Sequence, residues 1–189
     1  MTDDRSSSPD PSLQSAVPPP PKRRRWLRWL IEITLFLGVF LAVRTYMAPK
    51  VPESLAHAAL PLITAPTVSG GTATIGLPGQ PTALVFWATW CSICHVELPW
   101  LNDLSKTHRI ITVAMQSGDT QQVQKYLAEH QLNDLTVIND PDGAIARKFG
   151  VSVTPTMFFI APDGHIAMAE TGITSAWGIR LRLWWLAHF

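Results

Sequence analysis

A short apolar strand that leads directly into a helix with two cysteines limits the folds open to this chain. Residues 83–87, Ala-Leu-Val-Phe-Trp, are apolar and rich in strand formers, which predicts a buried strand. A brief turn follows, and from Ser92 to Lys106 the apolar residues recur at helical spacing. Cys91 and Cys94 therefore stand where a helix leaves the end of a strand.

Two thiols at the start of a helix are placed for redox chemistry. A helix N-terminus carries partial positive charge and unpaired N–H groups, and both favour the thiolate over the thiol. Cys91, at the mouth of the helix, is expected to be the exposed nucleophile. Cys94 lies one turn further on the same side, close enough to form a disulfide with Cys91. The chain has two cysteines, so any disulfide within one chain joins this pair.

The rest of the C-terminal part alternates between strand and helix patterns. A small hairpin is expected within residues 67–77. Further strands are predicted at 110–115, 135–138, 156–160 and 165–170, and further helices at 120–130, from the turn at 140–143 to residue 149, and at 175–187. Thr120 is a candidate cap for the second helix. This order of elements fits a mixed α/β sandwich.

The N-terminal third has a different composition. Residues 1–25, rich in Ser, Pro and Asp and ending in Lys-Arg-Arg-Arg, predict a disordered basic tail. Residues 26–46 are mostly apolar, with aromatic residues at both ends, and roughly 20 such residues span a bilayer core. We therefore predict a single transmembrane anchor at 26–46, a Pro- and Ala-rich linker at 47–66 and a globular domain at 67–189.

Charge sets the expected orientation of this anchor. The basic cluster precedes the apolar segment, so the positive-inside rule places the tail in the cytoplasm and the domain outside. Tyr46-Met47-Ala48 is a poor signal-peptidase site, which favours a retained anchor over a cleaved signal peptide. The formal net charge of the whole chain is +1, which gives no electrostatic case for nucleic acid as a partner.

Two motifs together resemble a known family. Residues 86–99, Phe-Trp-Ala-Thr-Trp-Cys-Ser-Ile-Cys-His-Val-Glu-Leu-Pro, resemble the active-site segment of thioredoxin-like proteins tethered to bacterial membranes, the TlpA, ResA and DsbE types. Residues 153–156, Val-Thr-Pro-Thr, resemble the loop in which this family carries a cis-proline beside the cysteines. The likeness runs from about Ala65 to the C-terminus and is greatest to the suppressor-of-copper-sensitivity (ScsD) type.

The resemblance implies a fold and an activity. The fold would be thioredoxin-like α/β, with residues 116–138 as the central helix–strand insert of this branch. The activity would be thiol–disulfide oxidoreduction without a cofactor or bound metal. The domain would face the periplasm from the cytoplasmic membrane. It would take electrons from a transmembrane thiol reductase and reduce disulfides of client proteins, in pathways of the copper-stress or cytochrome c maturation type.

The resemblance also implies roles for particular residues. Cys91 and Cys94 would form the redox-active disulfide, and Pro155 would be cis, so that Thr154 could pair with a client peptide. Glu97 would move the proton of Cys94, because Val85 fills the place where ordinary thioredoxins keep a buried acid. The substrate groove would be framed by Trp90, Thr154, Ser92 and Ile93, and the last two would also set the redox potential.

The same cysteines allow other readings. Cys91-Ser-Ile-Cys94-His95 matches the C-x-x-C-H pattern of c-type haem attachment, and its three ligand side chains could bind a soft ion such as Cu(I). A haem or copper carrier is therefore an alternative to an enzyme, and a disulfide-forming oxidant is an alternative to a reductant. His95 is expected to be a helix-surface residue that could tune the thiols.

Overall fold

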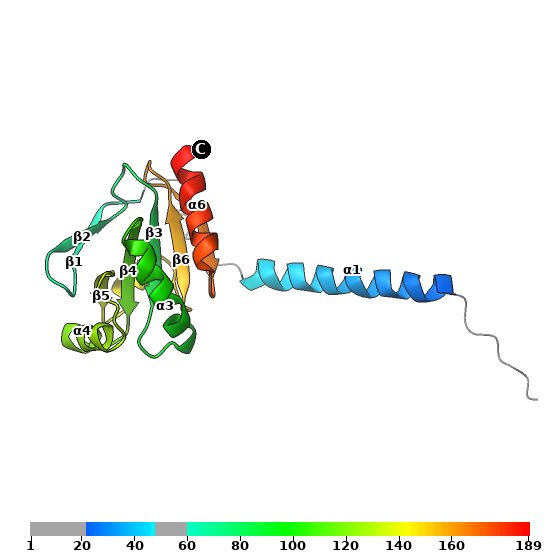
Figure 1. Cartoon of the computed structure of the whole chain (residues 1–189), viewed down its shortest axis with the longest axis horizontal. Helices are drawn as coiled ribbons and strands as arrows, with labels where there is room; N and C mark the ends of the chain where they lie inside the picture. The colour runs from blue at the N-terminus through cyan, green and yellow to red at the C-terminus, as the bar shows by residue number, and fades with distance from the viewer. Residues whose placement is uncertain (1–21, 48–59) are drawn as a thin grey trace, which may run out of the picture. The chain divides into compact units, whose positions relative to one another are not determined.

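The computed structural model describes residues 22–47 and 60–189, which divide into two separate units. The first contains the helix α1 (Lys22–Met47), and the second contains all the other described elements (Figure 1). Residues 22–25, predicted as part of the tail, belong to α1, while 1–21 lie outside the described residues. The predicted anchor, residues 26–46, lies within α1. Across the described ranges, no helix combines the length and apolarity needed to cross a membrane.

A five-stranded mixed sheet forms the centre of the second unit. In spatial order its strands are β5 (Thr136–Asp140), β4 (Arg109–Met115), β3 (Thr82–Trp87), β6 (Thr156–Ile160) and β7 (Ile166–Thr171). β3, β4 and β5 are parallel, whereas β6 and β7 add antiparallel strands at the other side. The predicted strand at 83–87 is thus the middle strand, and each of its residues is buried.

Helices cover both faces of this sheet, so the domain has two cores. The helices of this unit are α3 (Ser92–Ser105), α4 (Thr120–Glu129), α5 (Ala144–Lys148) and α6 (Ala176–His188). Val85 and Trp87 of β3 pack into the core that contains residues of α3, α4 and α6. Leu84 and Phe86 point the other way, into a core with Phe149. The predicted elements from 82 onward are present, with ends that differ by at most two residues.

The hairpin begins earlier than expected, which corrects the predicted linker. Its strands are β1 (Ile63–Pro66) and β2 (Thr72–Ile75), which pair antiparallel. β1 lies within the predicted linker, residues 47–66, of which 48–59 lie outside the described residues. The prolines within residues 47–66 suggest a linker and not a strand. Pro66, however, is the last residue of an edge strand, where a missing N–H is tolerated.

The insert between β4 and β5 is present as α4 with its flanking loops. Its cap is Asp119 instead of the predicted Thr120. The carboxylate of Asp119 accepts the N–H of Gln122 at 2.8 Å, and Gln122 Oε1 accepts the N–H of Asp119 at 2.8 Å. This reciprocal capping box satisfies donors that a threonine one position later would leave free.

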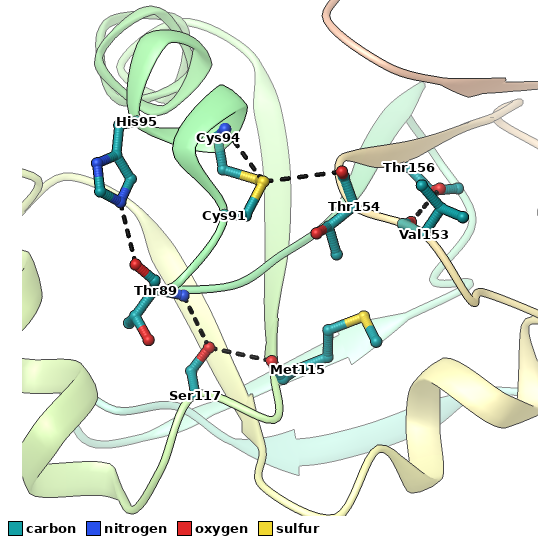
Figure 2. Close-up of a disulfide and its surroundings, with 9 residues drawn as sticks. All are labelled: Thr89, Cys91, Cys94, His95, Met115, Ser117, Val153, Thr154 and Thr156. Carbon is teal, nitrogen blue, oxygen red and sulfur yellow. Dashed lines mark hydrogen bonds between the residues drawn. A yellow bond between two sulfur atoms is a disulfide. The ribbon is translucent and has the colours of Figure 1, made fainter.

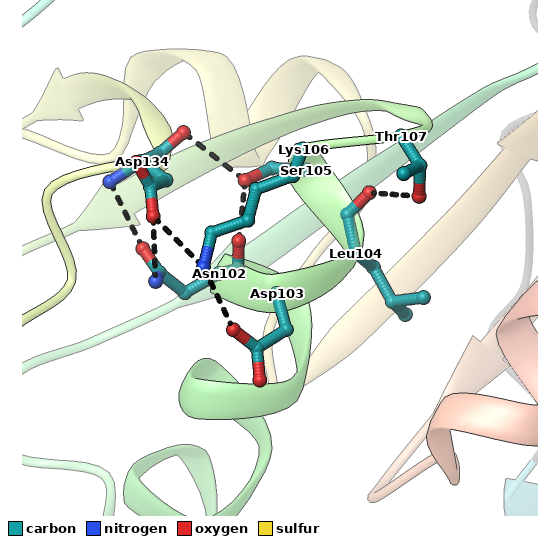
Figure 3. Close-up of polar contacts among 7 residues, drawn as sticks. All are labelled: Asn102, Asp103, Leu104, Ser105, Lys106, Thr107 and Asp134. Carbon is teal, nitrogen blue, oxygen red and sulfur yellow. Dashed lines mark hydrogen bonds and ion pairs between the residues drawn. The ribbon is translucent and has the colours of Figure 1, made fainter.

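The end of α3 is fastened to the loop before β5 (Figure 3). Asn102 is buried; its amide donates to Asp134 Oδ2 at 3.3 Å, and its Oδ1 accepts the N–H of Asp134 at 3.0 Å. The hydroxyl of Ser105 donates to the carbonyl oxygen of Asp134 at 3.1 Å. The helix that begins at the cysteines is therefore held at its far end by the insert.

Candidate active site

Cys91 and Cys94 form a disulfide at the start of α3, as the sequence predicts (Figure 2). Cys91 is the N-cap of α3, and the N–H of Cys94 donates to Cys91 Sγ at 3.2 Å. A hydrogen bond from a helix N-terminus stabilises negative charge on sulfur, because it pairs with the thiolate and adds the field of the helix dipole. After reduction, Cys91 is thus the sulfur better placed to become a thiolate.

Cys91 is less accessible than expected. Cys91 is 7% exposed and Cys94 is 1% exposed. The prediction of an exposed Cys91 is therefore wrong for the oxidised protein, although Cys91 is the more accessible of the pair. The reason is tertiary: its sulfur is bonded to Cys94 on one side and lies against a neighbouring loop on another.

That neighbouring loop contains Thr154 and Pro155. The peptide bond between them is cis, as the family resemblance implied. The carbonyl oxygen of Thr154 lies 3.7 Å from Cys91 Sγ (Figure 2). Antiparallel pairing of β3 and β6 places Thr156, the first residue of β6, beside Phe86 near the end of β3. The sheet register therefore brings this loop to the cysteines across 63 residues of sequence.

Of the four predicted groove residues, three are open to solvent and Thr154 is half-buried. Trp90 is 63% exposed, Ile93 is 50% exposed, and Ser92 is also exposed. The indole N–H of Trp90 donates to the carbonyl oxygen of Gln116 at 3.0 Å, which fixes its ring beside the end of β4. An aromatic and an aliphatic side chain thus flank the disulfide, where a client chain could contact them.

Two residues hold the segment just before Cys91 in place, and sequence reasoning missed both of them. Ser117 is buried; its Oγ accepts the N–H of Thr89 at 3.0 Å, and its hydroxyl donates to the carbonyl oxygen of Met115 at 3.0 Å (Figure 2). With Gln116, it ties the segment before Cys91 to the end of β4. The available signal was position: β3 and β4 are parallel neighbours, so the residues that follow them meet at one edge of the sheet.

Glu97 is a buried residue of α3, the helix that begins at the disulfide. It is 1% exposed and follows Cys94 by one helical turn on the same buried face of α3. Its Oε1 accepts the N–H of Thr174 at 2.8 Å. Burial raises the pKa of Glu97 to about 7; the Thr174 hydrogen bond opposes this shift, and the charge of Glu170 adds to it. A carboxylate with this pKa can take and return a proton near neutral pH.

The His95 side chain is directed at the backbone of Thr89 (Figure 2). Its Nε2 lies 3.0 Å from the carbonyl oxygen of Thr89, and its ring centroid lies 5.6 Å from those of Tyr126 and His130. Within the described ranges, no three His, Cys, Asp or Glu side chains are grouped so that they could hold a metal ion. In this oxidised form the sulfurs of Cys91 and Cys94 are bonded to each other.

Comparison with known proteins gives the family. A family model described as AhpC/TSA family matches residues 57–169. A thioredoxin-like protein of Haemophilus influenzae is 32% identical over 164 residues, which cover 83% of this chain and 93% of that protein. The thiol:disulfide interchange protein DsbE of Pseudomonas fluorescens is 33% identical over 155 residues, with 79% of this chain and 86% of that protein covered.

A solved structure agrees with these relatives. It is a secreted Mycobacterium tuberculosis disulfide oxidoreductase homologous to E. coli DsbE, 29% identical, with a TM-score of 0.54 over 64% of this chain and 93% of that one. The fold of residues 60–189 is thus thioredoxin-like. The chain has a Cys-x-x-Cys disulfide at the start of α3, and its relatives are thiol–disulfide exchange proteins. It therefore belongs to the AhpC/TSA family and is a thiol–disulfide oxidoreductase.

Proposed function

We propose that this protein reduces disulfides of client proteins on the outer side of the cytoplasmic membrane. The observation that carries the proposal is the Cys91–Cys94 disulfide at the N-terminus of α3, with the carbonyl oxygen of Thr154 3.7 Å from Cys91 Sγ. A reactive sulfur beside a loop backbone is the arrangement needed to align a client peptide and attack its disulfide.

The exchange begins with the reduced enzyme. The Cys91 thiolate attacks one sulfur of a client disulfide; a bond forms between the two proteins, and the other client sulfur leaves as a thiolate. The Cys94 thiolate then attacks Cys91 Sγ, so the bond to the client breaks and the client leaves fully reduced. Two electrons pass to the client, and the enzyme ends with the Cys91–Cys94 disulfide seen here.

Glu97 supplies the base for the second step. Cys94 is buried and attacks only as a thiolate, so its proton must move to a nearby group. The Glu97 carboxylate lies one turn away on the same buried face of α3. Burial raises its pKa to about 7, so it can take up and release a proton near neutral pH. In our proposal it accepts the Cys94 proton during attack and returns it when the disulfide is next reduced.

The client would bind over the cysteines. The backbone of Thr154 offers polar groups to an extended peptide, and the exposed rings and chains of Trp90 and Ile93 offer apolar contact on either side. The likeness to the ScsD and DsbE types suggests clients of copper-stress or cytochrome c maturation pathways. Trapping of mixed disulfides would identify them.

The charges near the pair support reduction of clients as the direction of transfer. Ser92 and Ile93 place no cation between the cysteines, and Glu97 adds negative character beneath them when ionised. Both features disfavour the thiolate form of the reduced enzyme, whose stabilisation is what makes a strong oxidant. We expect a reduction potential well below the roughly −120 mV of such an oxidant.

Attachment to the membrane remains a prediction from the sequence. Residues 26–46, preceded by four basic residues, would hold the domain on the outer side, near a transmembrane thiol reductase as electron donor. Extraction of membranes from expressing cells with alkaline carbonate tests this. The full chain should stay in the membrane, and a variant with Leu37→Lys and Val39→Lys should be released. Release of the unaltered chain would contradict the anchor.

Substitution of each cysteine tests the chemistry. Cys91→Ser should abolish reduction of insulin, whereas Cys94→Ser should accumulate a mixed disulfide between Cys91 and a client, because the resolving thiol is missing. Trapping through Cys94 in the Cys91→Ser variant would reverse the assigned roles.

Equilibration of the native protein with glutathione gives the reduction potential of the Cys91–Cys94 pair. A reduction potential near −120 mV would make the protein an oxidant.

A further inference from the structure

A chain of polar contacts joins Glu97 to an ion pair between β7 and α6. Thr174, in the loop between β7 and α6, donates its N–H to Glu97 Oε1 at 2.8 Å and its hydroxyl to Glu170 Oε2 at 3.1 Å. The other oxygen of Glu170 accepts from Arg182 Nη2 at 2.5 Å. One buried threonine thus bridges the carboxylate of α3 to charges on β7 and α6.

The ion pair is held more firmly than a surface pair. The side chains of Glu170 and Arg182 are 24% and 28% exposed. The guanidinium of Arg182 also donates to the carbonyl oxygen of Gly178 at 2.9 Å and lies 5.6 Å from the ring centroid of Phe159. Partial burial reduces screening by solvent, so these charges act on their neighbours more strongly than exposed ones.

The surroundings of Glu97 leave few charges to act on it. Along α3, Glu97 follows Cys94 by one turn, and the disulfide-bonded cysteines do not titrate in this oxidised form. From β3, behind the helix, the core receives apolar side chains such as Val85. From β7 comes the carboxylate of Glu170, and from α6 comes Arg182, which pairs with Glu170. The negative charge on Glu170 opposes ionisation of Glu97, and Arg182 offsets that charge.

We propose that Glu170 and Arg182 are positioning residues that set the pH at which Glu97 gives up its proton. Removing Arg182 would leave Glu170 uncompensated, so Glu97 would hold its proton to higher pH. Removing the charge of Glu170 would have the opposite effect. The consequence for thiol exchange rests on the proposed role of Glu97 as the base for Cys94: the pH range of the second step would follow the protonation of Glu97.

Opposite shifts from the two partners are the signature to measure. In the full-length oxidised protein, the Glu97 carboxyl carbon is followed by NMR with 13C-labelled glutamate and assigned by its loss in Glu97→Gln. Glu170→Gln should move its titration down by about half a pH unit or more, and Arg182→Met should move it up by a similar amount. The double variant should return close to the native midpoint. Damage to packing alone would not produce opposite signs.

Matched variants and a second readout complete the test. Arg182→Lys keeps the charge and should titrate like the native protein; Arg182→Gln, which also removes the charge, replaces Arg182→Met if that variant fails to fold. Lys125→Met and Glu129→Gln, from an exposed pair on α4 with N···O 3.8 Å, should leave Glu97 unchanged. The pH profile of insulin reduction should shift in the same directions as the NMR titration.

The outcomes separate this inference from the proposed function. Shifts of the same sign, or no shift with either partner altered, would overturn the inference even if Glu97→Gln changes the rate profile. Opposite NMR shifts with a rate profile that ignores Glu97 would support the charge coupling and overturn the role of Glu97 as base. Opposite shifts in both readouts would support both.

Discussion

Replacing Glu97 with glutamine should stabilise the oxidised protein at alkaline pH and have little effect at acidic pH. Glutamine keeps the oxygen that accepts the Thr174 N–H but cannot ionise. The pKa of Glu97 is raised from its ordinary value of 4.5 to about 7 in the folded protein, chiefly by burial. The folded state therefore binds this proton more tightly than the unfolded state.

The size of the effect follows from that difference in pKa. Below about pH 4.5 the carboxyl is protonated in both states, and its contribution to stability is fully present; as pH rises through about 7, that contribution is lost. One pKa unit corresponds to about 1.4 kcal/mol, so ionised Glu97 costs about 3 kcal/mol of folding free energy. Glu97→Gln removes this cost, and its advantage over the native protein should grow to about 3 kcal/mol between these limits.

Guanidinium unfolding of both proteins at about pH 4 and about pH 8.5 measures the change. The disulfide is kept intact, so the cysteines do not titrate. Glu129→Gln, on the exposed surface of α4, is the control and should follow the native protein at both pH values. If the stability of Glu97→Gln relative to the native protein is the same at both pH values, the pKa of Glu97 is not raised in the folded protein and the reasoning is refuted.

Three further substitutions test other contacts. Asp140→Ala should destabilise the fold by about 2 kcal/mol or more, because both its oxygens accept backbone N–H groups at the start of α5; thermal unfolding would show it, and an unchanged midpoint would contradict it. Asn102→Ala should cost about 1–3 kcal/mol through its paired bonds to Asp134, measured by urea unfolding. Trp90→Phe, which loses the bond to Gln116, should raise the KM for insulin several-fold at constant stability; an unchanged KM would remove Trp90 from the client site.

The order of elements in the domain could be read from the sequence because each depends on local pattern. Apolar runs of strand length and helical spacing predicted every strand and helix from β3 to α6 within two residues. Cys91 and Cys94 were placed at a helix start because that position depends on the pattern of adjacent residues. The strand β1 was missed because the prolines in and before it suggest a linker, while the pairing with β2 that makes it a strand is a contact between segments.

The environment of the site was decided by tertiary structure. The sequence named Thr154 and Glu97 through family resemblance, but the distance from Thr154 to Cys91 depends on the register of β3 against β6. Sequence spacing gives no measure of how far a side chain is removed from water. The pKa of Glu97 is raised because the packing of α3 against neighbouring elements buries the carboxyl and places Glu170 nearby. Local pattern therefore determined where the cysteines stand, and long-range packing determined which charges and backbone groups act on them.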